Sequence, residues 1–206
     1  MVGVVRCGSG NIGSVVSAME YLGADTVVVE EPSQIEQCER LVLPGVGSFR
    51  EAMCRLEEKS FVPALNKFVL EVKKPILGIC LGMQLMSQTG LEGGETRGLG
   101  WFEGTVQKIQ TDSGKERIPH VGWNELTIRR PHALLQGIPN SADFYFVHSY
   151  TLATKDRDCV VADCLYGDGV TAIVARDNIF AVQFHPEKSQ DHGLRMLENF
   201  LGWNPS

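Results

Sequence analysis

The segment Pro75-Ile76-Leu77-Gly78-Ile79-Cys80-Leu81-Gly82-Met83-Gln84 decides how the rest of this chain is interpreted. Its apolar run behind a proline is typical of a buried parallel strand, and glycines stand two residues before and after Cys80. This is the spacing of a strand-to-helix turn that presents a nucleophile, where other side chains would collide with the turn or with a substrate. The helix that follows would favour the thiolate. The segment predicts a nucleophilic Cys80, although cysteine is also a common small core residue.

Length and composition restrict the class of protein. A chain of 206 residues suits one domain, which we expect to cover residues 1–206. The net charge of −6 and the lack of a basic run argue against nucleic acid or an anionic membrane as a partner. No apolar stretch approaches the roughly 20 residues of a membrane span, and the first residues are too short an apolar run for a signal peptide. We therefore expect a cytoplasmic protein.

Cysteine and histidine usage indicates neither disulfides nor a metal site. The six cysteines show no C-x-x-C spacing, and without a signal peptide we expect them to be reduced. The five histidines form no pair at the spacing of metal ligands. We expect no metal and no other cofactor.

The first half of the chain alternates predicted strands and helices. The strands are expected at 2–6, 26–30, 41–43 and in the apolar run 76–79 before Cys80, and the helices at 12–22, 50–56 and 61–72, with a short helix from Pro32. This order implies a parallel sheet with right-handed crossovers, helices on both faces and functional loops at the carboxyl ends of the strands.

The second half is predicted to be rich in strands. We expect a mobile connection at 90–100, then strands at 104–109, 123–128, 144–150, 159–166, 171–176 and 179–184, and a final helix at 190–201. Asp177-Asn178 is a hairpin turn signal between the last two strands. The predicted fold is a single-domain α/β structure, with a flavodoxin-like, doubly wound, mostly parallel sheet and an antiparallel elaboration in the C-terminal half.

A base for Cys80 is predicted in the segment Gln183-Phe184-His185-Pro186-Glu187. His185 follows a predicted strand, and Glu187 could accept a hydrogen bond from one imidazole nitrogen while the other faces Cys80. The order Cys, His, Glu differs from the Ser, Asp, His order of α/β hydrolases. We therefore predict a catalytic triad of Cys80, His185 and Glu187.

The segment Pro44-Gly45-Val46-Gly47, after another predicted strand, is a candidate oxyanion hole. Its glycines would allow the N–H groups of Val46 and Gly47 to turn toward a ligand, together with the N–H of Leu81. The same residues could instead form an ordinary tight turn.

Together these motifs resemble the class I, or triad, glutamine amidotransferases. Further motifs narrow the resemblance to one branch, the glutaminase subunits of imidazole glycerol phosphate synthase, an enzyme of histidine biosynthesis. They are G-S-G-N at 8–11, L-P-G-V-G at 43–47, I-C-L-G-M-Q-L at 79–85, P-H-V-G-W-N at 119–124, Y-F-V-H-S-Y at 145–150 and Q-F-H-P-E-K-S at 183–189. Cys7, before the first of them, is a small departure from the pattern.

The resemblance implies a reaction and a partner. Cys80 would attack the side-chain amide of L-glutamine, and His185 would protonate the departing ammonia and then activate water. Gln84 would help to hold the glutamine, with backbone contacts from His148, Ser149 and Tyr150. The ammonia would pass to a cyclase subunit with a (β/α)8 barrel fold, which would form a heterodimer with this chain. That subunit would make imidazole glycerol phosphate and an aminoimidazole carboxamide ribotide.

Three further residues are candidates for the interface with such a cyclase, namely Asn11, Trp123 and Lys188. Tryptophan is enriched at interface hot spots, and a lysine beside the triad could pair with a carboxylate of the partner. His120 has no role that the sequence suggests, and Pro119 before it indicates a loop.

Other functions share these motifs. The chain could donate ammonia to a different synthase, such as one that forms an amidine on a sugar, which co-purification would reveal. It could also be a non-catalytic partner protein on the same fold, which labelling of Cys80 by a glutamine-analogue electrophile would exclude. A nucleotide binder at 8–11 is less well supported, because the full phosphate-binding fingerprint is missing.

Overall fold

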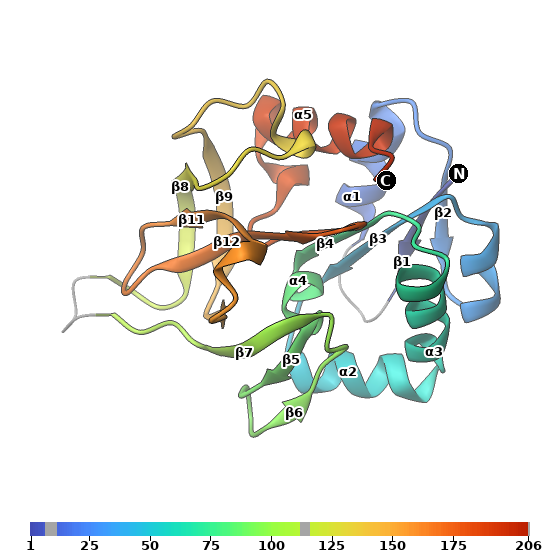
Figure 1. Ribbon diagram of the computed structural model, residues 1–206, viewed down its shortest axis with the longest axis horizontal. Coiled ribbons are helices and arrows are strands. Elements are labelled where there is room, and N and C mark those ends of the chain that lie inside the picture. Colours follow the sequence, from blue (N-terminus) through green and yellow to red (C-terminus); the bar gives the residue numbers. More distant parts are fainter. Residues whose placement is uncertain (7–11, 112–115, 206) are drawn as a thin grey trace.

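The computed structural model describes residues 1–6, 12–111 and 116–205 (Figure 1). Its largest element is a nine-stranded sheet. The strands of this sheet are β1 (Val2–Val5), β2 (Thr26–Val29), β3 (Arg40–Gly45), β4 (Ile76–Cys80), β8 (His120–Ile128), β9 (Asp143–His148), β11 (Val160–Cys164), β12 (Val170–Arg176) and β13 (Ile179–Val182). They lie in the order β2-β1-β3-β4-β13-β12-β11-β8-β9.

The parallel part of this sheet confirms the predicted topology. All pairings from β2 to β13 are parallel, and their order matches the flavodoxin-like arrangement of doubly wound folds. From β13 to β9 the pairings are antiparallel. The antiparallel elaboration thus continues the same sheet, so the sheet as a whole is mixed rather than mostly parallel.

Helices cover both faces of the sheet (Figure 1). The helix α1 (Gly13–Tyr21) and the C-terminal α5 (Gln190–Gly202) lie on one face, and α2 (Phe49–Glu58) and α3 (Phe61–Asn66) on the other. The remaining helical segments are short: η1 (Pro32–Gln37), η2 (Lys67–Glu71), α4 (Leu81–Leu85), η3 (Ala133–Leu135), η4 (Arg157–Cys159) and η5 (Pro186–Lys188). Among the helices of the described segments, none has the length and apolar character needed to cross a bilayer.

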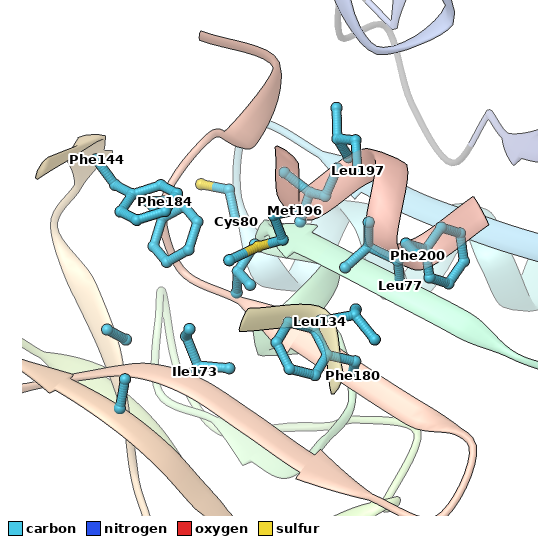
Figure 2. Packing of buried hydrophobic residues seen from close by; sticks show 14 of the residues in the cluster. Leu77, Cys80, Leu134, Phe144, Ile173, Phe180, Phe184, Met196, Leu197 and Phe200 are labelled. Carbon is cyan, nitrogen blue, oxygen red and sulfur yellow. The ribbon is translucent and has the colours of Figure 1, made fainter. Parts of the chain in front are cut away.

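The core follows from the alternation of apolar residues along the strands. In β3, Leu41 and Leu43 pack on the side of α2 and α3, whereas Val42 packs on the side of α1 and α5. Figure 2 shows part of the apolar cluster on the side of α1 and α5. Side chains of α5 lie there over the sheet, near Leu77 and Cys80. Every residue of β4 is buried, because β3 and β13 flank it and helices cover both faces.

The predicted hairpin at Asp177-Asn178 is confirmed. Arg176 and Ile179 pair across it, and Asp177 has a φ of +49°, as tight two-residue turns require. The buried Asn178 amide donates hydrogen bonds to the carbonyls of Val69 (2.9 Å) and Lys74 (2.7 Å). These bonds attach the hairpin to the chain that enters β4.

The expected mobile connection at 90–100 is wrong. The chain there forms the end of β5 (Ser87–Gly90) and the whole of β6 (Thr96–Arg97), which pair antiparallel. These strands join β7 (Phe102–Lys108) and β10 (Tyr150–Ala153) in a second sheet, in the order β10-β7-β5-β6. Gly98 serves close packing, since a Cβ there would lie 2.2 Å from the carbonyl oxygen of Ser87.

Two other predicted elements are divided in the structure. The helix expected at 61–72 is α3 followed by a wider π-type turn, η2. The strand expected at 144–150 is β9 followed by β10, which belong to different sheets. The chain therefore passes from the large sheet to the small one at Ser149.

Candidate active site

Cys80 stands at the end of β4 in a strained backbone conformation. Its φ of 54° and ψ of −111° are rare for a residue with a side chain. The glycines two residues before and after Cys80 both lie in tight packing, as expected. A Cβ at Gly82 would lie 1.7 Å from the carbonyl oxygen of Leu43, and one at Gly78 would lie 2.7 Å from the methyl carbon of Met86. The turn therefore leaves no room for a side chain at Gly82, whereas a side chain at Gly78 would have to displace the end of Met86.

His185 lies beyond the end of β13 and is held by its neighbours. Its backbone N–H donates to the carbonyl of Tyr145 (2.9 Å) in β9, and its carbonyl accepts from the Ser189 hydroxyl (2.6 Å). Its Nδ1 lies 2.7 Å from Oε1 of Glu187, and both side chains are buried. The predicted contact between His185 and Glu187 is present.

The surroundings of His185 favour its charged form. Burial opposes the charge, but the interactions with Cys80 and Glu187 outweigh burial and raise the pKa of His185 to about 10. The other ring nitrogen, Nε2, is buried and has no hydrogen-bond partner among the described residues. This arrangement leaves Nε2 available for proton exchange with a reacting group near Cys80.

The predicted oxyanion loop, residues 44–47, lies beside the strand-to-helix turn at Cys80, here called the elbow. The reason is that Gly45 pairs with Cys80 in the register of β3 and β4. Val46 is more than half exposed, and Gly47 has a φ of +100°. A small cavity of about 30 Å³ is lined by residues of this loop and by His185 and Glu187. The structure thus brings the three predicted motifs together at one edge of the sheet.

Two glutamine side chains lie behind Cys80. The buried Gln84 amide donates to the carbonyl of Tyr150 (3.0 Å) and to Oε1 of Gln183 (3.0 Å), so only its oxygen remains for a ligand. Nε2 of Gln183 lies 3.8 Å from Cys80 Sγ. No role for Gln183 follows from its motif alone, but its place two residues before His185 in an extended segment indicates that the two side chains share a face.

The segment 148–150 passes close to the same point. Cys80 Sγ lies 3.9 Å from the carbonyl oxygen of Val147, one residue before His148. The His148 imidazole is buried, and both of its nitrogens contact protein atoms. The backbone at Ser149 and Tyr150 is therefore the part of this segment that could contact a substrate.

No metal centre accompanies this site in the described part of the chain, where no group of three or more His, Cys, Asp or Glu side chains is arranged to hold an ion. The cysteines that the structure describes are free thiols, and Cys7 lies outside the described residues.

Comparison with known protein families identifies the family. A model described as "Glutamine amidotransferase class-I" matches residues 4–202. The chain belongs to this family. Proteins named imidazole glycerol phosphate synthase subunit HisH are similar to it over almost the whole chain. The HisH 1 protein of Campylobacter jejuni (strain RM1221) is 49% identical to this chain, and the alignment covers 98% of this chain and 99% of that protein. The HisH protein of Desulfitobacterium hafniense (strain DSM 10664 / DCB-2) is 44% identical and covers 98% and 94%.

A solved structure supports the amidotransferase fold. A crystal structure described as that of a glutamine amidotransferase superposes with a TM-score of 0.75, at 22% identity, and covers 98% of this chain and 99% of its own. At that identity the likeness concerns the fold alone.

The three predicted interface residues of this amidotransferase have different outcomes. Asn11 lies outside the described residues. Lys188 is exposed directly after Glu187. Trp123 is 47% exposed on β8 and belongs to a group of apolar side chains on that strand and its neighbour.

That group, the outer patch, consists of Val121, Trp123, Tyr145 and Val147. Val121 pairs with Val147 and Trp123 with Tyr145 across β8 and β9, and the two aromatic rings are 6.0 Å apart. The backbone carbonyls of Tyr145 and Val147 are the groups that contact His185 and Cys80. The strand β9 therefore carries side chains of the outer patch and contacts the triad through its backbone.

Proposed function

We propose that this chain is the glutaminase subunit of an imidazole glycerol phosphate synthase, with residues 1–206 forming one amidotransferase domain. The observation that carries the proposal is the 49% identity to a HisH subunit over 98% of the chain, combined with the contact between His185 and Glu187 next to Cys80. The substrate would be L-glutamine, and the products glutamate and ammonia.

The reaction begins with attack of Cys80 Sγ on the carbonyl carbon of the glutamine side chain, with the thiol proton carried by His185 Nε2. The negative charge on the carbonyl oxygen is stabilised by N–H groups of Val46, Gly47 and Leu81. His185 then donates its proton to the leaving nitrogen, and ammonia departs from a γ-glutamyl thioester. In the second half, His185 takes a proton from water, and the resulting attack releases glutamate and regenerates the thiol.

Glu187 and the glutamines behind Cys80 assist without exchanging protons with the substrate. Glu187 orients the imidazole through Nδ1 and stabilises its charge. Gln84 and the backbone at Ser149 and Tyr150 hold the glutamine.

We propose that the ammonia passes to a cyclase subunit of the (β/α)8 barrel type. The outer patch, together with Lys188 and Asn11, would form the docking surface. Exposed apolar groups of this kind mark interaction sites on soluble proteins, and this one lies over the strand that contacts the triad.

The proposal is tested by Cys80→Ser and Cys80→Ala in the purified complex with the cyclase. Both variants should abolish imidazole glycerol phosphate formation from glutamine, because Cys80 serves only the release of ammonia. Formation from added ammonium salts should persist. Loss of both activities in an assembled complex would contradict the division of labour.

The two alternative functions, an ammonia donor for another synthase and a non-catalytic partner protein, predict different experimental results. A wild-type chain that co-purifies with another synthase, and supports its reaction, would identify a paralogous ammonia donor. A wild-type chain that is not labelled at Cys80 by a diazoketone analogue of glutamine would be a non-catalytic partner protein.

A further inference from the structure

His120 occupies a buried position in the large sheet, where a loop residue was expected. It is the first residue of β8, not part of a loop, and it lies opposite His148 in the register of β8 and β9. Its ring is buried between the rings of Phe146 and Tyr166, at centroid distances of 4.8 and 3.8 Å. The ring is therefore held in one orientation by stacking on both faces.

Hydrogen bonds assign a single proton position to each of the two imidazoles. His148 Nδ1 lies 2.8 Å from the carbonyl oxygen of Tyr150, which can only accept, so Nδ1 carries the hydrogen. Burial lowers the pKa of both His120 and His148 to about 4, so both rings are neutral at pH 7. His148 Nε2 is then an acceptor, and it receives a hydrogen bond from His120 Nδ1 at 3.0 Å.

Hydrogen-bond donation runs in the same direction on the other side of His120. His120 Nε2 faces the side-chain amide nitrogen of Asn124 at 3.4 Å, and that nitrogen also lies 3.2 Å from the carbonyl of Leu165. Each group thus donates to the next, from Asn124 through His120 and His148 to the carbonyl of Tyr150.

The carbonyl oxygen of Tyr150 is where this chain of hydrogen bonds meets the active site. It also accepts from Gln84, whose amide donates to Gln183 beside Cys80 Sγ. The backbone that turns from β9 into β10 is therefore held from two sides. One side is the pair of imidazoles, and the other is the pair of glutamines.

We propose that His120 is a positioning residue of the glutamine site, which holds the backbone at Ser149 and Tyr150 through the N–H that it donates to His148. This inference rests on the proposed function, because that backbone would contact the substrate. His120 itself touches neither the substrate nor Cys80. Without its donor, His148 Nε2 would be a buried acceptor with no partner, and the ring would gain freedom to rotate or to change its tautomer.

The test compares His120→Leu with His120→Asn in the complex with the cyclase. Leucine and asparagine have nearly the same shape, but only asparagine places an N–H donor where His120 Nδ1 lies. The control is His132→Leu, which removes a partly buried imidazole whose pKa is also lowered to about 4 and whose ring packs on Phe180 at 4.6 Å. Measured quantities are KM and kcat for glutamine hydrolysis, the thermal midpoint, and the concentration dependence of Cys80 labelling by the diazoketone analogue.

We expect His120→Leu to raise KM, and the half-saturating concentration of the label, by about tenfold, with a smaller change in kcat. His120→Asn should restore both values to within about threefold of the wild type, and His132→Leu should leave them within about twofold. Equal KM values for the leucine and asparagine variants would overturn the inference, as would loss of folding in both. Absence of hydrolysis by the wild-type complex would instead contradict the proposed function.

Discussion

The two ring nitrogens of His185 have different surroundings, and this difference assigns their tasks. Nδ1 is bound to the buried carboxylate of Glu187, and Nε2 has no partner among the described residues. Burial alone would leave the ring neutral, but Cys80 and Glu187 raise its pKa to about 10. The ring can therefore hold the proton that departing ammonia would need in the proposed reaction.

At this scale we predict that His185→Ala lowers glutamine hydrolysis by about a thousandfold, since both proton transfers lose their carrier. Glu187→Gln should lower it by only about tenfold, because the amide oxygen still accepts from Nδ1 while its charge is lost. The charge change should also move the pH profile of kcat toward lower pH, because the pKa of His185 falls. Steady-state rates between pH 6 and 10 measure both effects. A loss for Glu187→Gln that equals the loss for His185→Ala would contradict an orienting role.

At the scale of the elements, the active site is produced by the register between neighbouring strands. Parallel pairing of β3 and β4 places Gly45 beside Cys80, and pairing of β4 with β13 brings His185 to the same edge. The two loop glycines then differ in their surroundings. A Cβ at Gly45 would lie 3.0 Å from Cβ of Leu81, whereas a Cβ at Gly47 would meet no atom of the described residues within 4 Å.

We predict that Gly47 allows the oxyanion loop to change between two orientations, of which only one presents its N–H groups to the substrate. Binding of the acceptor to the cyclase would favour the productive one. Gly47→Ala, at a φ of +100°, should then lower cyclase-stimulated hydrolysis by about a hundredfold but basal hydrolysis much less. Gly45→Ala should lower both, because it crowds the elbow itself. Rates with and without the cyclase and its nucleotide substrate provide the measurement, and equal losses for Gly47→Ala would exclude a switch.

At the scale of the whole molecule, β9 connects the surface with the interior. The exposed side chains of the outer patch stand on the same two strands as the buried pair of His120 and His148. The backbone of β9 also contacts Cys80 and His185. A partner bound to the patch would therefore be separated from the reacting groups by a single strand.

We predict that Trp123→Ala weakens binding of the cyclase by about thirtyfold, because a large aromatic side chain would lose its buried contact with the partner. Tyr21→Ala is the matched control, since it removes an exposed aromatic ring (78% exposed) from α1, outside the outer patch. Dissociation constants from calorimetric titration would show the difference. Similar affinities for the two variants would place the interface elsewhere.

The titration of four histidines with shifted pKa values predicts the pH dependence of stability. The pKa values of His120, His132 and His148 are lowered to about 4, so the unfolded chain binds more protons than the folded one as the pH falls from about 6.5 to 4. The free energy of unfolding should decrease over that range. The pKa of His185 is raised to about 10, so its contribution is complete below pH 6.5 and is lost as the pH rises toward 10.

Stability should therefore be greatest near pH 6.5. Urea unfolding between pH 4.5 and 9 tests this expectation, with His132→Leu expected to flatten the acid side. A free energy of unfolding that rises steadily from pH 5 to 9 would contradict it.

The sequence by itself determined the parts of this protein that local patterns encode. The apolar run before Cys80 and its flanking glycines predicted the strand and the turn that follows it, since the close backbone of Leu43 leaves no room for a side chain at Gly82. The segment from His185 to Glu187 predicted their contact, because two residues across a proline remain near each other in any fold. Strand and helix alternation predicted the parallel half of the sheet.

Tertiary structure alone decided the features that depend on the pairing of distant strands. Nothing near His120 in the sequence indicates His148, and the two meet only because β8 and β9 pair in one register. Gln183 acquires its contact with Cys80 in the same way, across β4 and β13. The strand predicted at 144–150 divides at Ser149 because its two parts find partners in different sheets. Hydrogen bonds between strands join residues far apart in the chain, so a local pattern does not record them.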